Sequence, residues 1–295
     1  SEVVKKVTLP TKLVYSENLS SLTGGKVYLK PENMQCTGAY KVRGAYYKIS
    51  TMTKEERERG LITASAGNHA QGVAFAAQKF GCKATIVMPT VTPLIKVNRT
   101  KNYGAEVILY GDVFDDSYAY AVKLAEETGK TLVHPFDDLD VATGQGSIAM
   151  EIIQELPTVD YILVPIGGGG LITGVATLAK MLNPKIQIIG VEPKSAASMS
   201  AALEAGEPVT LPSANTIADG TAVKRVGENI FPYCKENIDQ ILTVEDDELI
   251  GAFLDMVENH KMIVENSGLL TIAALKQMDL TRKKAVAILS GGNMD

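Results

Sequence analysis

The sequence contains no tryptophan, and its three cysteines and three histidines lie far apart along the chain. An odd number of scattered cysteines fits neither a disulfide framework nor a Cys-x-x-Cys metal site, and it favours the reducing cytoplasm as the compartment. The histidines do not have the spacing of a metalloprotease motif, so we expect no catalytic transition metal. The residues concerned are Cys36, Cys82, Cys234, His69, His134 and His260.

The chain also lacks long apolar runs and blocks of basic residues. No run approaches the roughly 20 apolar residues that span a bilayer, and the N-terminus has no signal-peptide pattern. The net charge of −5, without a Lys/Arg cluster, argues against nucleic acid as a partner. The rest of the composition is ordinary for a globular α/β protein: 45% of the 295 residues are hydrophobic.

Buried-strand patterns alternate with amphipathic helical patterns through most of the length. This alternation predicts an α/β fold with mostly parallel sheets flanked by helices, in which ligands bind beyond the carboxyl ends of the strands. The expected strands are residues 27–30, 61–65, 84–88, 106–110, 161–165, 186–191 and 285–289. The expected helices include residues 42–49, 70–80, 94–103, 115–127, 144–156 and 171–182.

The most informative segment is a glycine run, Gly167, Gly168, Gly169 and Gly170, between an expected strand and a helix that opens near Leu171. Without side chains, the backbone N–H groups of such a turn can all point at one anion, and the helix adds the positive end of its dipole. No Lys-Ser/Thr pair follows, so this is not a Walker loop. The run predicts a phosphate cradle for a phosphorylated small molecule.

Three further loops are expected at strand ends, namely residues 37–41, 65–69 and 290–293. Lys41 opens a helical pattern, where the helix dipole is unfavourable for an ammonium and should lower its pKa. A lysine of lowered pKa is the neutral amine that forms Schiff bases, although position alone favours a solvated surface lysine. A Schiff-base lysine and a phosphate cradle are together what pyridoxal phosphate requires.

The other candidate residues each have a plain and a functional interpretation. The loop from Ser65 to His69 is either a helix cap or a site for a substrate carboxylate, in which Asn68 could also donate to a cofactor ring oxygen. Ser290 either ends a strand or faces a pyridine nitrogen, where a neutral hydroxyl makes the ring a weaker electron sink and suits β-elimination. Tyr40 is either a core aromatic or a stacking platform.

Taken together, these segments resemble the threonine/serine dehydratases of the fold type II, tryptophan-synthase-β-like family of pyridoxal-phosphate enzymes. The resemblance covers essentially the whole chain. It implies pyridoxal 5'-phosphate as the cofactor and the conversion of L-threonine to 2-oxobutyrate, or of L-serine to pyruvate, with release of ammonia. The segments that carry it are residues 30–45, 65–72, 143–146, 165–171, 216–220 and 289–293.

The resemblance also implies roles for single residues. Lys41 would hold the cofactor as a Schiff base and remove the Cα proton, and Tyr40, where the family usually has phenylalanine, would stack on the ring. The other cofactor contacts would be Asn68, Gly167, Gly168, Gly169, Gly170, Leu171, Gly220 and Ser290. The substrate carboxylate would be bound by Ser65, Gly67, Asn68 and His69.

The expected organisation is a larger cofactor-binding lobe from residues 1–52 and 138–295, with a smaller lobe from residues 53–137 that carries the asparagine loop, residues 65–69. The resemblance further implies a homo-oligomer, a dimer or tetramer, and a chain that continues beyond Asp295. No metal site is expected. Glu192 matches one of two acidic residues that hold a cation in serine racemases, but Ser198 stands where the second, an aspartate, is expected.

Several alternatives remain open at this point. A serine racemase is disfavoured because Ala66 replaces the serine that donates a proton in those enzymes. A cysteine-synthase-type enzyme is disfavoured by the context of Lys41, and a catalytically silent ligand sensor is also possible. An NAD-dependent oxidoreductase would use Glu192 on a ribose, but Ile172 stands where the third glycine of its motif belongs.

Overall fold

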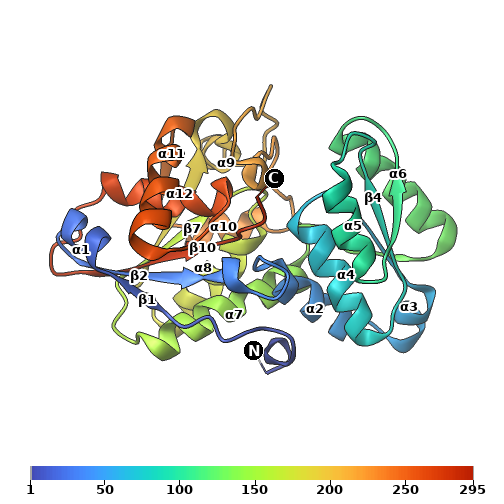
Figure 1. The fold of residues 1–295 in the computed structure, drawn as a ribbon, viewed down its shortest axis with the longest axis horizontal. Helices are drawn as coiled ribbons and strands as arrows, with labels where there is room; N and C mark the ends of the chain where they lie inside the picture. The colour runs from blue at the N-terminus through green and yellow to red at the C-terminus, as the bar shows by residue number, and fades with distance from the viewer. Residues whose placement is uncertain (1, 295) are drawn as a thin grey trace.

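The computed structural model describes residues 2–294, which form two lobes that lie side by side (Figure 1). The larger sheet has the strand order β1-β2-β10-β7-β8-β9, in which only β1 is antiparallel, and the smaller sheet has the wholly parallel order β5-β4-β3-β6. The predicted α/β class with two mostly parallel sheets is confirmed. The strands are β1 (Val14–Ser16), β2 (Lys26–Pro31), β3 (Leu61–Ala64), β4 (Ala84–Met88), β5 (Glu106–Leu109), β6 (Thr131–Leu132), β7 (Tyr161–Pro165), β8 (Gln187–Pro193), β9 (Gln240–Val244) and β10 (Lys284–Leu289).

Helices flank both sheets, and within residues 2–294 none is long and apolar enough to cross a membrane. The α-helices are α1 (Glu17–Thr23), α2 (Lys41–Thr51), α3 (Lys54–Arg59), α4 (Asn68–Phe80), α5 (Leu94–Asn102), α6 (Phe114–Thr128), α7 (Leu139–Glu155), α8 (Gly170–Leu182), α9 (Ser198–Ala205), α10 (Phe231–Asn237), α11 (Asp246–Asp255) and α12 (Asn266–Ala274). Short 3₁₀ or π turns are η1 (Val4–Lys6), η2 (Glu32–Met34), η3 (Lys194–Ala196), η4 (Asp219–Thr221), η5 (Met256–His260) and η6 (Leu275–Gln277).

All seven expected strands are present, with ends that differ by at most two residues. Strands β1, β6 and β9 were not expected, because β1 and β6 are only three and two residues long and β9 is a partly exposed edge strand. The four strands of the smaller sheet lie between Leu61 and Leu132. The lobe boundaries at residues 53 and 137 stay a prediction.

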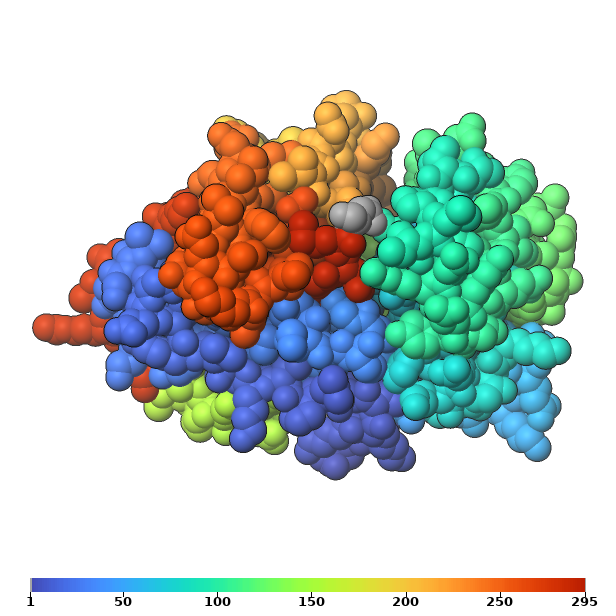
Figure 2. All heavy atoms as spheres, viewed as in Figure 1, coloured from blue at the N-terminus to red at the C-terminus, as the bar shows by residue number. Residues whose placement is uncertain are grey.

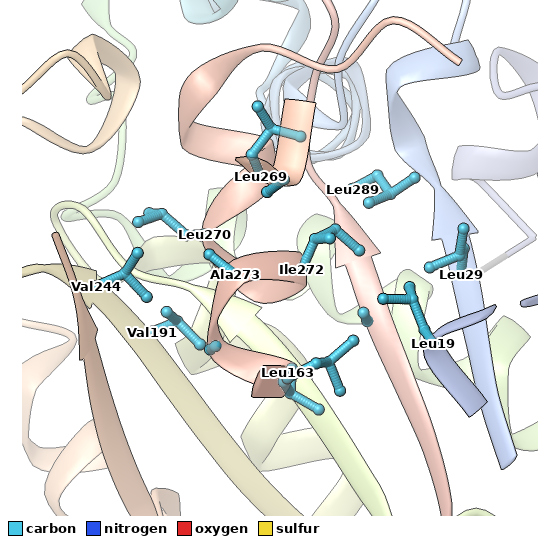
Figure 3. Close-up of a cluster of buried hydrophobic side chains, with 14 of the residues drawn as sticks. Leu19, Leu29, Leu163, Val191, Val244, Leu269, Leu270, Ile272, Ala273 and Leu289 are labelled. Carbon is cyan, nitrogen blue, oxygen red and sulfur yellow. The ribbon is translucent and has the colours of Figure 1, made fainter. Parts of the chain in front are cut away.

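Helix α12 covers one face of the larger sheet (Figure 3). Its side chains Leu269, Leu270 and Ile272 pack with Leu163 of β7 and Val191 of β8, and all five are at most 1% exposed. Burying a side chain of this size stabilises the fold by about 1.5–3 kcal/mol. The sheet is therefore a rigid support for the loops at its carboxyl edge.

Glycines let helices α2, α7 and α8 cross closely. A Cβ atom on Gly174 of α8 would lie 1.9 Å from the carbonyl oxygen of Ala142, and one on Gly144 of α7 would lie 2.6 Å from that of Arg43. The segment at residues 143–146, which contributes to the family resemblance, thus lies inside α7 and serves helix packing.

A buried ionic cluster fixes the start of α2. Arg43 is fully buried, and its guanidinium donates to both carboxylate oxygens of Glu32 at 2.7 and 2.8 Å and to those of Glu151 at 2.7 and 2.8 Å. Lys30 of β2 also pairs with Glu151 at 2.6 Å. Removing one partner from such a buried pair typically costs about 3–5 kcal/mol, so the cluster ties α2 firmly to β2, η2 and α7.

Candidate active site

The loops that were expected at strand ends meet between the two lobes. The N–H of Tyr40 donates to the carbonyl of Ser290 at 3.1 Å, and the side-chain amide of Asn293 donates to Oδ1 of Asn68 at 2.8 Å. The C-terminal segment that carries Ser290, dark red in Figure 2, lies at the boundary between the lobes. Four segments far apart in the sequence therefore share one place: the turn before α2, the start of α4, the glycine run and the C-terminal turn.

Lys41 is the first residue of α2, and its amine lies inside this junction. Its Nζ donates to the carbonyl of Pro135 at 2.7 Å and is 5.4 Å from the centroid of the Tyr40 ring. Burial lowers the pKa of Lys41 to about 8, and the charge of Glu265 opposes this shift. The predicted direction of the shift holds, but burial is its main cause, and not the helix dipole as expected.

The glycine run forms the turn between β7 and α8. Gly169 has φ of 101°, a conformation that favours glycine, and no side chain caps α8. The amides of Gly167, Gly168, Gly169, Gly170 and Leu171 donate to no other group among the described residues. Free amides at an uncapped helix start are the donor set that a phosphate group takes, so this observation fits the phosphate of pyridoxal phosphate.

Phe136 and the backbone of Gly220 pack closely against the glycine run. A Cβ atom on Gly168 would lie 2.1 Å from Cγ of Phe136, and one on Gly167 would lie 3.2 Å from the carbonyl oxygen of Gly220. Phe136 follows Pro135, the residue that holds the Lys41 amine. The lysine and the glycine run are thus joined through two consecutive residues.

The segment from His134 to Asp137 was missed in the sequence analysis. Nδ1 of His134 accepts hydrogen bonds from the amides of Phe136 and Asp137 at 3.2 and 2.8 Å. Burial lowers the pKa of His134 to about 4, so the ring is neutral and can accept. The segment lies beyond the carboxyl end of β6, but a strand of two residues gives no pattern that could have revealed it.

The asparagine loop opens α4 in the same uncapped way. The Ser65 hydroxyl accepts from the amide of Gly67 at 3.2 Å and keeps its own hydrogen for another acceptor. The amides of Asn68, His69 and Ala70 donate to no group of the described chain, so they could bind a carboxylate.

His69 points away from this anion site. Its Nε2 lies 2.9 Å from the carbonyl of Val133, the ring is buried, and burial lowers its pKa to about 3. The ring is therefore neutral and uses its N–H on that carbonyl. If His69 contributes to carboxylate binding, it does so through its backbone amide.

Glu265 is the second feature that the sequence analysis missed. It immediately precedes α12, is only 7% exposed, and its Oε1 accepts from Nδ2 of Asn68 at 2.7 Å. Burial and, to a lesser degree, the charge of Asp219 raise the pKa of Glu265 to about 7. The sequence around Glu265 gives no local pattern that could have revealed it, because nearly all of α12 is buried.

Glu192 is engaged in helix capping. Its carboxylate accepts from the amides of Met199 and Ser200 at 2.7 and 3.0 Å, and from the Ser200 hydroxyl at 2.6 Å. Within the described part of the chain, no group of three or more His, Cys, Asp or Glu side chains could hold a metal ion.

The fold and this arrangement of residues define a class of enzymes. The family model of pyridoxal-phosphate dependent enzymes matches residues 4–291, and the chain belongs to this family. Within it, the chain is a homologue of threonine ammonia-lyases: it is 47% identical over 293 residues to L-threonine ammonia-lyase of Thermotoga maritima, which covers 99% of this chain and 73% of the relative.

Solved structures show that this fold is shared by threonine deaminases and serine racemases. The processed form of threonine deaminase isoform 2 from Solanum lycopersicum superposes with a TM-score of 0.96 at 44% identity, covering 99% of this chain and 82% of that one. Maize serine racemase superposes with a TM-score of 0.95 at 36% identity, covering 100% and 91%. The family membership identifies pyridoxal phosphate as the cofactor and rejects the nicotinamide alternative.

Proposed function

We propose that this chain catalyses the dehydration and deamination of L-threonine to 2-oxobutyrate and ammonia, and of L-serine to pyruvate and ammonia. The observation that carries the proposal is the position of the Lys41 amine: it is held by Pro135, whose neighbour Phe136 packs directly on the uncapped glycine run. The names of the homologues, L-threonine ammonia-lyase and threonine deaminase, support the choice of substrate.

The residues would hold the cofactor as follows. The glycine run with Leu171 would bind the phosphate, Lys41 would take the aldehyde, Tyr40 would stack on the ring, Asn68 would donate to the ring oxygen, and Ser290 would face the pyridine nitrogen. The backbone of Gly220 would approach the ring. When bound, pyridoxal phosphate supplies an aldehyde that links amines covalently and a ring that accepts electron density from Cα.

The chain itself would bind the amino acid and move its proton. The free amides at the start of α4 and the hydroxyl of Ser65 would fix the substrate carboxylate and so orient the Cα–H bond. Lys41 would take the Cα proton, for which an amine with a pKa of about 8 is well matched to neutral pH. Tyr40 and Lys41 are half-buried between the lobes, which would limit the access of bulk water to this proton.

The test is a spectroscopic and kinetic one. The purified protein with pyridoxal phosphate should show a visible absorption band, and borohydride should abolish it and label Lys41. Threonine should give 2-oxobutyrate. Lys41→Ala should abolish the labelling and lower the activity by at least about 10³-fold. A labelled protein that does not convert threonine or serine would point to the ligand sensor instead.

Serine racemase is the second candidate, because the maize enzyme is structurally similar over the whole chain. We propose that racemisation is slow here, because Ala66 offers no proton to the face of Cα opposite the lysine. A chiral assay of serine tests this, since D-serine formed faster than pyruvate would identify a racemase.

We further propose a cytoplasmic homo-oligomer. Several large apolar side chains are exposed on the larger lobe, among them Met34, Ile263 and Leu254. Light scattering after size exclusion should give the mass of a dimer or tetramer, and a mass of one chain would contradict this.

A further inference from the structure

Asn68 is the residue that would donate to the ring oxygen of the cofactor, and an asparagine side chain can do this in only one of its two orientations. Its carboxamide has an acceptor oxygen and a donor nitrogen of nearly the same shape. If the group were rotated by half a turn, the oxygen would face the ring oxygen and repel it. What fixes the orientation of Asn68 therefore decides whether it can act on the cofactor.

Two neighbours determine this orientation from opposite sides. Nδ2 of Asn293 donates to Oδ1 of Asn68 at 2.8 Å, and Nδ2 of Asn68 donates to Oε1 of Glu265 at 2.7 Å. A rotated carboxamide would place nitrogen against nitrogen and, with Glu265 ionised, oxygen against carboxylate, so two hydrogen bonds would become two repulsive contacts. Asn293 is itself oriented, because its Nδ2 also donates to the carbonyl of Thr37 at 2.8 Å.

The backbone leaves space for this network. A Cβ atom on Gly291 would lie 2.3 Å from Oε1 of Glu265 and 3.0 Å from Nδ2 of Asn68, and one on Gly38 would lie 2.4 Å from Oδ1 of Asn293. The N–H of Glu265 donates to the carbonyl of Gly291 at 3.0 Å, which ties the backbone of Glu265 to the C-terminal turn at residues 290–293. The network thus links the small-lobe loop to the C-terminal turn of the larger lobe.

We propose that Glu265 and Asn293 are positioning residues that hold the carboxamide of Asn68 with one N–H free for the ring oxygen of the cofactor. This inference rests on the proposed function, because it assigns Asn68 to the cofactor. One hydrogen of Nδ2 is used by Glu265, and the second is the one that remains for the ring. Neither Glu265 nor Asn293 needs to touch the cofactor.

The test compares two substitutions at Glu265 in the holoenzyme. Glu265→Gln keeps a side-chain oxygen that can accept from Asn68, whereas Glu265→Leu has a similar size and no acceptor. We expect Glu265→Gln to retain the wild-type visible band and to change the Kd for pyridoxal phosphate by less than about threefold. Glu265→Leu should shift the band and raise the Kd by about tenfold or more.

A double-mutant cycle separates positioning from general damage. If Glu265 acts through Asn68, the double variant should resemble Asn68→Ala alone. Adding Glu265→Leu to Asn68→Ala should leave the position of the band unchanged and change the Kd for pyridoxal phosphate by less than about twofold. Equal losses in the presence and absence of Asn68 would overturn the inference, and so would a Glu265→Leu variant that is folded and has an unchanged band.

Asn293→Asp tests the network from the other side, whether or not Glu265→Leu folds. It places an acceptor against Oδ1 of Asn68 and should shift the band in the same way. Asn266→Asp is the matched control, because Nδ2 of Asn266 donates to the carbonyl of Ile217 at 2.9 Å outside the network; it should leave the band unchanged. A band that is unchanged in Asn293→Asp, or shifted equally by Asn266→Asp, would overturn the inference.

The failure of this inference can be told from the failure of the proposed function. If borohydride labels no Lys41 in the wild-type protein, the proposed function fails. If Lys41 is labelled and threonine is turned over, but the effects of Glu265 and Asn68 simply add, only the positioning role fails.

Discussion

The glycine run and the asparagine loop are built alike but packed differently. Both join a strand to a helix that has no side-chain cap, and both leave backbone amides free to bind an anion. In the glycine run, the space around Gly168, Gly169 and Gly170 is filled, with protein atoms 2.1–2.9 Å from the position of each missing Cβ. At Gly67 of the asparagine loop, no atom lies within 4 Å of that position.

The difference matches the residence time of the two anions that we propose. A cofactor phosphate stays through many turnovers, and a cradle with fixed backbone suits it because no ordering is needed on binding. A substrate carboxylate enters and leaves in each turnover, and an open loop at the edge of the smaller lobe leaves room for this. The same donor set can thus serve a permanent and a transient ligand, depending on what packs behind it.

The largest effect is expected for Gly168→Ala. The new methyl group would lie 2.1 Å from Cγ of Phe136, so the turn or the ring must move. We expect a loss of about 1–3 kcal/mol in the free energy of unfolding and a Kd for pyridoxal phosphate at least about 100-fold higher. Thermal unfolding and cofactor titration measure both. Adding Phe136→Ala should restore part of the stability. An unchanged Kd in Gly168→Ala would show that the close packing of the glycine run does not matter for cofactor binding, and the proposed difference from the asparagine loop would then fail.

The same substitution at Gly67 should act on the substrate instead. Gly67→Ala adds its methyl group to open space, so stability and the Kd for the cofactor should stay close to wild type. Because the methyl group stands beside the free amides of the loop, we expect the KM for threonine to rise by about tenfold. Steady-state kinetics measure this, and a loss of cofactor affinity similar to that of Gly168→Ala would show that the loops do not differ.

The amine between the two loops gives a prediction on pH. The pKa of Lys41 is lowered from 10.5 to about 8. The fraction of Lys41 that is neutral therefore increases about tenfold per pH unit up to pH 8 and then levels off. The rate at which pyridoxal phosphate loads the apoprotein should follow this curve, as measured by the growth of the visible band between pH 6 and 9.5. A rate that still increases tenfold per unit above pH 9 would mean that the lysine is exposed.

The same shift has a consequence for stability. Between pH 8 and 10.5 the unfolded chain binds more protons at Lys41 than the folded chain, so this residue's contribution to stability increases with pH in that window. Lys41→Met should remove this increase. Urea titrations of both apoproteins at pH 8 and 10 provide the comparison.

The smallest effect is expected for Ala66→Ser. A hydroxyl in the open asparagine loop could supply a proton to the substrate, so D-serine should form slowly while threonine dehydration stays within about threefold. A chiral assay detects this. No D-serine above the wild-type level would show that the hydroxyl does not reach Cα.

Much of the site could be predicted from the sequence because the apolar patterns showed where the strands end. Lys41, Asn68, the glycine run and Ser290 each follow a strand with a clear apolar pattern, and parallel sheets bring such ends together. The structure places all four around one junction. Their roles toward the cofactor stay predictions.

The missed parts lacked a local pattern. Pro135 and Phe136 follow a strand of only two residues. Glu265 precedes α12, in which every residue except Asn266 is buried, so this helix has no amphipathic period to mark its start. These residues matter because they contact residues far away in the sequence, and local sequence patterns do not reveal such contacts.

The ionic cluster around Arg43 has a consequence for the precision of catalysis. A shift of α2 along its axis by one residue would separate Arg43 from two carboxylates at once and leave charges stranded in the interior. The helix is therefore held in a single register, and Arg43 lies two residues after Lys41. The Cα of Lys41 is thus anchored by its neighbours in α2, so any change in the position of its nitrogen must come from its side-chain torsions.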